Sequence, residues 1–262
     1  MATTSNIGRV RRLTKRMPPV VGEVGIRALR MAGLPGAWVR YVLSMRAYKR
    51  LPGSEQLRLR DAHPKLADRL PTSPFDPHYF HQDAWAARWV AAAAPKRHVD
   101  VGSRVDLVGF LTAITQVTFV DIRPLEASLE RLESVTGSVL DLPYADRSLE
   151  SVSCLHVAEH IGLGRYGDPL DPHGTQKAAR ELQRVLAPGG QLLFSLPVGT
   201  PRVCFNAHRV HAPSQVRAYF DELELTEHAG VDDDGRFARW RSLDELEGLR
   251  YACGMFRFVR PS

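Results

Sequence analysis

Three aspartates follow three apolar segments of the chain, each where a strand is expected to end. Asp100 closes the first segment, Asp121 ends the second and Asp141 follows the third. In doubly wound sheets, ligands bind at the carboxyl ends of the strands. A carboxylate at Asp121 can accept both hydroxyl hydrogens of a ribose, and one at Asp141 can reach the amino group of an adenine. Together, their order and spacing indicate a nucleoside site more specifically than any one of them alone.

A second group of reactive side chains follows the fourth expected strand. His156, Glu159 and His160 lead into a segment rich in glycine and proline, residues 162–173. A neutral imidazole near its usual pKa can accept a hydroxyl proton. We therefore expect His156 or His160 as a general base with Glu159 as its orienting partner, under a lid formed by residues 162–173. The alternative is that His156 merely ends a strand and Glu159-His160 open a helix.

Two metal sites can be read from the same region. The segment from His156 to His160 matches the H-x-x-E-H pattern of inverted zinc peptidases, but that pattern needs a long helix and here it straddles a strand end. Asp168, Asp171 and His173 offer ligands that suit magnesium. A Pro/Asp-rich turn is the better explanation of these three residues. We predict no metal.

Alternating strands and helices are expected to position these side chains. Strands are predicted at 98–101, 117–122, 138–140, 151–155 and 191–196, and helices at 83–91, 105–114, 124–133 and 174–187. This alternation predicts an α/β, doubly wound and mostly parallel sheet. Beyond residue 197, a helix at 214–220 and strands at 224–228 and 251–259 fit a reversed final hairpin.

At these segments the sequence resembles class I methyltransferases that use S-adenosylmethionine (SAM), over about residues 80–200 and more loosely beyond. The resemblance implies a Rossmann-like domain with seven strands, an antiparallel last strand, and SAM as cofactor. Arg104 departs from the family, because it stands where a second glycine is usual; it must point away from the cofactor or pair with the cofactor's carboxylate. The matching segments are 99–102, 120–122, 141–149, 155–161 and 181–194, and the cofactor contacts that they imply are Asp100, Gly102, Ser103, Arg104, Asp121, Asp141, Leu142 and His156.

Residues 98–172 also resemble a narrower, uncharacterised methyltransferase-like family linked to surface-glycan genes. Its hallmarks lie at 100–104, 159–168 and 206–209. The resemblance implies O-methylation of a glycan, a nucleotide sugar or another small hydroxylated acceptor. Asn206, His208 and Arg209 offer donors suited to sugar hydroxyls or an anionic group. The acceptor-binding residues that the resemblance implies are Arg165, Tyr166, Asp168, Asn206, His208 and Arg209.

Other functions are less consistent with the sequence. A nucleic-acid methyltransferase would carry Asn/Asp-Pro-Pro-aromatic after the fourth strand or a reactive cysteine after proline, whereas Cys154 lies inside that strand. A nicotinamide dehydrogenase would carry G-x-G-x-x-G. A non-catalytic scaffold that has lost SAM is the alternative that Arg104 favours.

The charge is concentrated at the N-terminus. Residues 1–60 hold 13 Lys/Arg and 2 Asp/Glu, whereas the whole chain of 262 residues has a net charge of +6. We expect residues 1–80 to form a basic helical extension and connector, and residues 81–262 the methyltransferase domain. Trp38, Tyr41 and Tyr48 recur at helical spacing beside arginines, so this helix packs on the domain or touches anionic lipid or an acidic partner.

The localisation follows from two absences in the sequence. Three scattered cysteines give no disulfide framework, and no apolar run is long enough to span a membrane. We therefore expect a cytoplasmic protein, with peripheral contact at the inner face of the membrane as the alternative.

Overall fold

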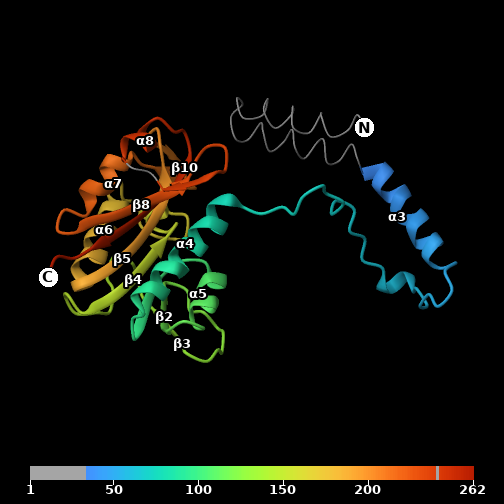
Figure 1. Ribbon diagram of the computed structural model, residues 1–262, viewed down its shortest axis with the longest axis horizontal. Helices are drawn as coiled ribbons and strands as arrows, with labels where there is room; N and C mark the ends of the chain where they lie inside the picture. The colour runs from blue at the N-terminus through green and yellow to red at the C-terminus, as the bar shows by residue number, and fades with distance from the viewer. Residues whose placement is uncertain (1–33, 240–241) are drawn as a thin grey trace. The chain divides into compact units, whose positions relative to one another are not determined.

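The computed structural model describes residues 34–239 and 242–262 (Figure 1). The chain divides into two compact units, residues 1–74 and residues 75–262. In the first unit, α3 (Leu34–Tyr48) is followed by the short helix η1 (Leu59–Asp61). α3 carries Trp38, Tyr41 and Tyr48 on one helix, as their spacing predicts, and residues 1–33 of the expected basic extension lie outside the described residues. Within the described part of the chain, no helix is long and apolar enough to cross a membrane.

The second unit is built on an eight-stranded sheet with the order β3-β2-β1-β4-β5-β10-β8-β9. The first five strands in this order run parallel, and β10 runs antiparallel to both of its neighbours. The doubly wound, mostly parallel fold with a reversed last strand is therefore confirmed, with β9 added at the edge. The strands are β1 (Arg97–Val101), β2 (Gln116–Asp121), β3 (Leu132–Thr136), β4 (Leu149–Leu155), β5 (Leu186–Val198), β8 (Glu224–Val231), β9 (Phe237–Arg239) and β10 (Ala252–Val259).

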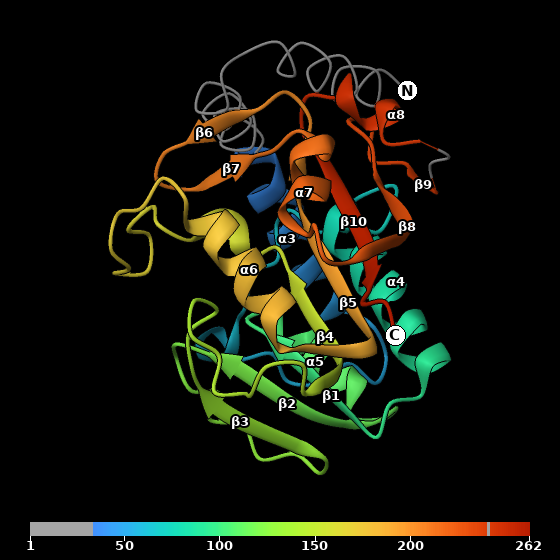
Figure 2. The same cartoon turned by 90° about the vertical axis from the view of Figure 1, so that its left-hand side faces the viewer.

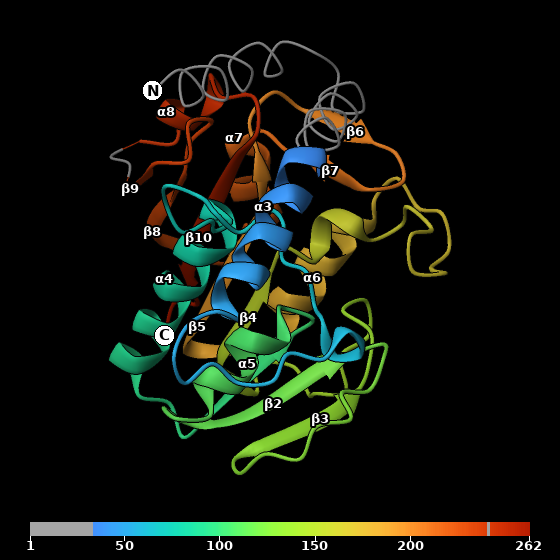
Figure 3. The same cartoon turned by 90° about the vertical axis from the view of Figure 1, so that its right-hand side faces the viewer.

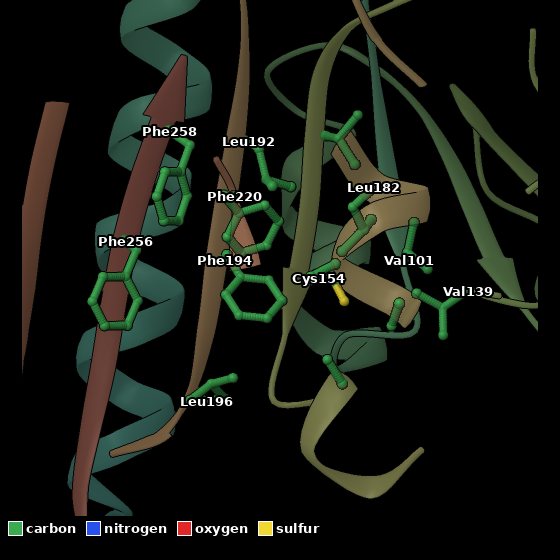
Figure 4. Packing of buried hydrophobic residues seen from close by; sticks show 14 of the residues in the cluster. Val101, Val139, Cys154, Leu182, Leu192, Phe194, Leu196, Phe220, Phe256 and Phe258 are labelled. Carbon is green, nitrogen blue, oxygen red and sulfur yellow. The ribbon is translucent and has the colours of Figure 1, made fainter. Parts of the chain in front are cut away.

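Helices cover both faces of the sheet (Figures 2 and 3). Because successive strand residues face opposite sides, β4 sends Cys154 into one core with Leu182, and Leu155 into the other with Trp85. Figure 4 shows the first core, where Phe194 packs edge-on against Phe220 at 4.9 Å between ring centroids. The helices are α4 (Pro77–Ala93) and α5 (Val105–Leu111) on the Trp85 side, and α6 (Gly174–Val185) and α7 (Pro213–Tyr219) on the Leu182 side.

α4 begins earlier than the sequence predicts. Asp76 caps it, because its carboxylate accepts the backbone N–H of His78 at 2.9 Å, and Pro77 occupies the first turn. The segment before residue 81, which we expected to be a connector, is thus partly helical. This extra turn adds His78 and Tyr79 to the helix that covers the sheet.

The secondary structure predicted for the segment between β2 and β4 is wrong. No helix spans 124–133 and no strand spans 138–140; instead β3 pairs with β2 over five residues. A helix there would need a core-facing apolar stripe, but Leu129 is 48% exposed. Pairing Leu132–Thr136 with β2 extends the sheet, and Ser138 with Asp141 forms only an isolated bridge.

Short elements beyond β4 and β5 complete the unit. The single turn η2 (Ala158–His160) follows β4, and β6 (Arg202–Cys204) pairs with β7 (His208–Val210) in a hairpin after β5. α8 (Asp244–Glu247) precedes β10.

Candidate functional site

A pocket of about 270 Å³ lies at the carboxyl ends of β1 and β4. Its walls come from the loop after β1, from β4 and η2, from the loop after η2, and from α4 and β7. Two groups that the sequence singled out, the glycine loop and the His156–His160 segment, thus face the same space.

The loop after β1 rests on a buried carboxylate. Asp100 is fully buried; its Oδ1 accepts the backbone N–H of Ser103 at 3.0 Å and its Oδ2 accepts the Ser153 hydroxyl. Burial raises the pKa of Asp100 to about 6, although these donors oppose the shift. Gly102 and Ser103 line the pocket, whereas Asp100 lies beneath them and holds the loop.

The backbone conformation at position 102 requires glycine. Its φ is +69°, and a Cβ at this position would lie 3.1 Å from Val157 Cγ1. A side chain here would be strained and crowded, so glycine lets the backbone approach the pocket directly.

Arg104 lies on the pocket wall. Its guanidinium is 4.8 Å from the centroid of the Tyr79 ring and 2.8 Å from Asp106 Oδ2. The side chain is therefore held by an aromatic ring and a carboxylate. Tyr79 was not among the predicted site residues, because the start of α4 was not recognised in the sequence.

The two other aspartates of the predicted cofactor site differ from each other. Asp121 Oδ2 lies 3.6 Å from the position of a Cβ on Gly102, so this carboxylate flanks the loop. It is paired with Arg123, whose Nε is 3.2 Å from Oδ1. Asp141 is exposed and Leu142 is buried, with its N–H bonded to Glu181 Oε1, and neither residue lines the pocket.

His156 is held in one orientation. It adopts a φ of 56° at the end of β4, and its Nδ1 lies 2.5 Å from Gln82 Oε1 and 3.2 Å from Ser195 Oγ. Since a carbonyl oxygen only accepts, Nδ1 carries the proton and Nε2 presents a lone pair. Nε2 is buried with no hydrogen-bond partner among the described residues. Burial lowers the pKa of His156 to about 3, so it is neutral at pH 7.

Glu159 and His160 sit on the single turn η2. Burial raises the pKa of Glu159 to about 8 and lowers the pKa of His160 to about 4, so both are uncharged at neutral pH. His160 Nδ1 donates to the carbonyl of Ala207 at 2.6 Å, and its Nε2 lies 3.6 Å from Glu159 Oε1. Glu159 Oε2 is buried without a partner in the part of the chain that the structure describes. Glu159 therefore neighbours His160, whereas Gln82 and Ser195 orient His156.

The loop after η2 contributes Arg165 and Tyr166 to the pocket. The Tyr166 ring contacts two guanidinium groups, with its centroid 4.9 Å from Cζ of Arg123 and 5.1 Å from Cζ of Arg165. Asp168 does not line the pocket; it accepts the backbone N–H groups of Gly162 at 2.6 Å and Tyr166 at 3.2 Å. Burial raises the pKa of Asp168, but these backbone donors outweigh it and the pKa lies below its usual range.

The magnesium alternative finds no support in this loop. Asp171 is paired with Lys177 at 2.6 Å, and its Oδ1 accepts the backbone N–H of His173. Over residues 34–239 and 242–262, no cluster of three His, Cys, Asp or Glu side chains could hold a metal ion.

The β6–β7 hairpin supplies one of its three predicted residues to the pocket. His208 lines the pocket, and its ring centroid lies 5.3 Å from that of Tyr251. Tyr251 also lines the pocket and was not predicted from the sequence. Arg209 is buried and donates to the carbonyls of Ile161 at 2.6 Å and Asp171 at 2.8 Å, so it ties down the loop after η2. Asn206 is exposed and lies outside the pocket lining.

Comparison with known proteins supports the fold rather than a reaction. Residues 116–232, less than half of the chain, match a family model described as "Caenorhabditis protein of unknown function, DUF268". A search of curated proteins found no match.

Solved structures share the architecture at low identity. A candidate methyltransferase from Bacillus halodurans C-125 is 16% identical, with 69% of this chain and 99% of that chain covered and a TM-score of 0.50. A candidate sarcosine dimethylglycine methyltransferase from Galdieria sulphuraria is 15% identical, with coverages of 70% and 86% and a TM-score of 0.51. The cyclase SpnF is also 15% identical, with coverages of 68% and 81% and a TM-score of 0.51. Residues 75–262 thus have the Rossmann-like fold of methyltransferases.

Proposed function

We propose that this protein transfers a methyl group from SAM to a hydroxyl of a small polar acceptor such as a glycan or a nucleotide sugar. One observation carries the proposal: the glycine loop after β1 and His156, whose buried Nε2 has no hydrogen-bond partner among the described residues, line a single pocket. Methyl transfer needs a cofactor and an acceptor held in line, with a group that receives the acceptor proton.

The residues around the pocket fit SAM in part. Gly102 and Ser103 offer backbone without a crowding side chain, and Arg104 offers a cation for the cofactor's carboxylate. Asp121 lies beside them and would hold ribose hydroxyls once it releases Arg123. When bound, SAM supplies a methyl group activated by a sulfonium. Asp141, exposed and outside the lining, supports no adenine contact here.

The acceptor side of the pocket is polar and aromatic. Arg165, His208 and Tyr166 offer hydrogen-bond donors and ring faces, which suit a hydroxylated acceptor. We propose His156 Nε2 as the group that receives the hydroxyl proton. As the oxygen gains a carbon substituent its proton becomes strongly acidic, so a weakly basic imidazole that is unprotonated at neutral pH suffices.

A second candidate function is a scaffold with the methyltransferase fold and no SAM binding. Its support is the ion pair of Asp121 with Arg123, which engages the carboxylate proposed for ribose, together with Arg104 in the glycine loop. The two candidates predict opposite results in one binding experiment.

The experiment titrates the protein with SAM and with S-adenosylhomocysteine (SAH) by calorimetry. We expect binding by the wild type and its loss in Asp121→Ala. Asp221→Asn is the control, because Asp221 accepts from Gln183 away from the pocket. No binding by the wild type at millimolar ligand would establish the scaffold instead. Equal binding by wild type and Asp121→Ala would remove Asp121 from the site.

A further inference from the structure

Under α4, the sheet buries a row of polar side chains where a hydrophobic core is expected. His98 and Asp100 of β1, Ser151 and Ser153 of β4, and Gln191 of β5 are each at most 3% exposed. They lie on the face that also carries Leu155 and Leu193, packed with Trp85. Burying polar groups costs free energy unless all of them are hydrogen-bonded.

These side chains form one continuous chain of hydrogen bonds. Arg257 Nε, on β10, donates to Gln191 Oε1 at 3.0 Å, and Gln191 Nε2 donates to Ser151 Oγ at 3.2 Å. Ser151 Oγ lies 2.8 Å from His98 Nδ1, and His98 Nε2 lies 2.9 Å from Ser153 Oγ. The Ser153 hydroxyl donates to Asp100 Oδ2, and Asp100 Oδ1 accepts the N–H of Ser103.

The two ends fix the direction of every bond between them. A guanidinium only donates, so Gln191 must offer Oε1 to Arg257 and its NH₂ to Ser151. An ionised carboxylate only accepts, so Ser153 must donate to Asp100 and accept from His98 Nε2–H. Burial lowers the pKa of His98 to about 3, so the ring is neutral. Its Nδ1 therefore accepts the Ser151 hydroxyl proton, and all donors point from Arg257 toward Asp100.

The chain ends at the pocket. Asp100 holds the N–H of Ser103, and Ser103 Oγ in turn accepts the N–H of Leu155, so the loop after β1 is tied to the end of β4. Both Ser103 and Leu155 line the pocket. Arg257, at the other end, is half-buried over the Trp89 ring at 4.1 Å and bonds Thr226.

We propose that His98, Ser151, Ser153, Gln191 and Arg257 are positioning residues that orient the Asp100 carboxylate and thereby set the geometry of the Gly102–Arg104 loop for ligand binding. Hydrogen bonds aligned head to tail polarise one another and strengthen the last bond, here that to Asp100. The effect on the ligand rests on the proposed function, whereas the effect on the loop does not.

The test uses two small substitutions, Ser153→Ala and Ser151→Ala, and their combination. Ser153 contacts Asp100 directly, whereas Ser151 reaches Asp100 only through His98 and then Ser153. The control is Thr118→Val on β2, which removes a buried hydroxyl bonded to Glu133 outside the row. The readouts are hydrogen exchange of the Ser103 amide by NMR, referenced to the Leu193 amide of the core, and SAH affinity by calorimetry.

We expect exchange at Ser103 to rise about tenfold in Ser153→Ala and about threefold in Ser151→Ala. The double variant should resemble Ser153→Ala alone, because breaking the last link makes the earlier one irrelevant. SAH affinity should fall in the same order, and Thr118→Val should change neither readout.

The outcomes separate the two proposals. If the wild type binds no SAH, the proposed function fails, and the exchange rates of the Ser103 amide alone then test this inference. The inference is overturned if Ser103 exchange is unchanged, if the two serine effects are additive, or if Thr118→Val reproduces them.

Discussion

Gln82 Oε1 lies 2.5 Å from His156 Nδ1, although the two residues are 74 positions apart in the sequence. The amide cannot turn freely, because its Nε2 donates to Asp83 Oδ1 at 3.1 Å. Ser195 also donates to the same Oε1. The proton of the imidazole is thereby fixed on Nδ1, away from the pocket.

The first prediction concerns this tautomer. Gln82→Leu removes the acceptor that holds the Nδ1 proton, so His156 should populate both neutral tautomers. The ¹⁵N chemical shifts of the imidazole measure this directly, and turnover with a hydroxylated acceptor should fall about tenfold. Gln183→Leu is the control, because Gln183 is a buried glutamine bonded to Asp221. Unchanged imidazole shifts in Gln82→Leu would show that Gln82 does not select the tautomer.

The sequence predicts the parts of the site that are local. Apolar segments identify β1, β4 and β5, and the residue types after them place Gly102 and His156 at strand ends, because parallel strands end at one edge. The strand β10 also follows from its sequence pattern, whereas its reversed direction is what the family resemblance implies. These features depend on few residues close together in the chain.

The remainder depends on tertiary contacts that have no local pattern. Gln82 reaches His156 only through the packing of α4, whose first turn was not recognised. Asp121 is paired with Arg123 two positions away, and no spacing rule distinguishes this from a free carboxylate. β3 replaces a predicted helix because pairing with β2 outweighs local helix propensity.

The second prediction concerns the pH dependence of stability. Burial raises the pKa of Glu159 from its usual 4.5 to about 8, so the folded state holds a proton that the unfolded chain releases. This contribution to stability is complete below pH 4.5 and is lost as the pH rises through about 8. Glutamine does not titrate, so Glu159→Gln keeps its stability as the pH rises. Between about pH 5 and about pH 9 its free energy of unfolding, measured with urea, should therefore increase by about 1–3 kcal/mol relative to that of the wild type.

Glu181→Gln provides a control of opposite sign. The hydrogen bond from Arg184 lowers the pKa of Glu181, so this carboxylate stabilises the fold above its usual pKa. Its amide variant should lose stability relative to the wild type as the pH rises. If Glu159→Gln follows the same direction as Glu181→Gln, Glu159 is ionised in the folded protein.

The third prediction concerns Arg123. Its ion pair with Asp121 must open before the carboxylate can hold a ribose. Arg123→Ala should therefore raise SAH affinity about two- to fivefold, the range of a partly exposed ion pair. Calorimetry measures the change. Arg97→Ala, which breaks an ion pair with Glu133 at the other end of β1, should leave the affinity unchanged. A lower affinity in Arg123→Ala would mean that Arg123 supports the ligand, either directly or through its contact with Tyr166.

The fourth prediction concerns Gly102. Alanine at a φ of +69° is strained by about 1–2 kcal/mol. It would also press on Val157, at 3.1 Å. Gly102→Ala should therefore lower the free energy of unfolding and, because the loop backbone moves, weaken SAH binding as well.

Gly167→Ala, in the loop after η2, measures backbone strain without crowding. Gly167 has a φ of +83°, but no atom lies within 4 Å of the position that a Cβ would take, so its variant carries the backbone strain alone. Urea unfolding should show a smaller loss for Gly167→Ala than for Gly102→Ala, and SAH affinity should remain at the wild-type value. Equal losses of stability would mean that Val157 yields without cost. The close contact of Gly102 with Val157 would then not be what requires glycine in the loop.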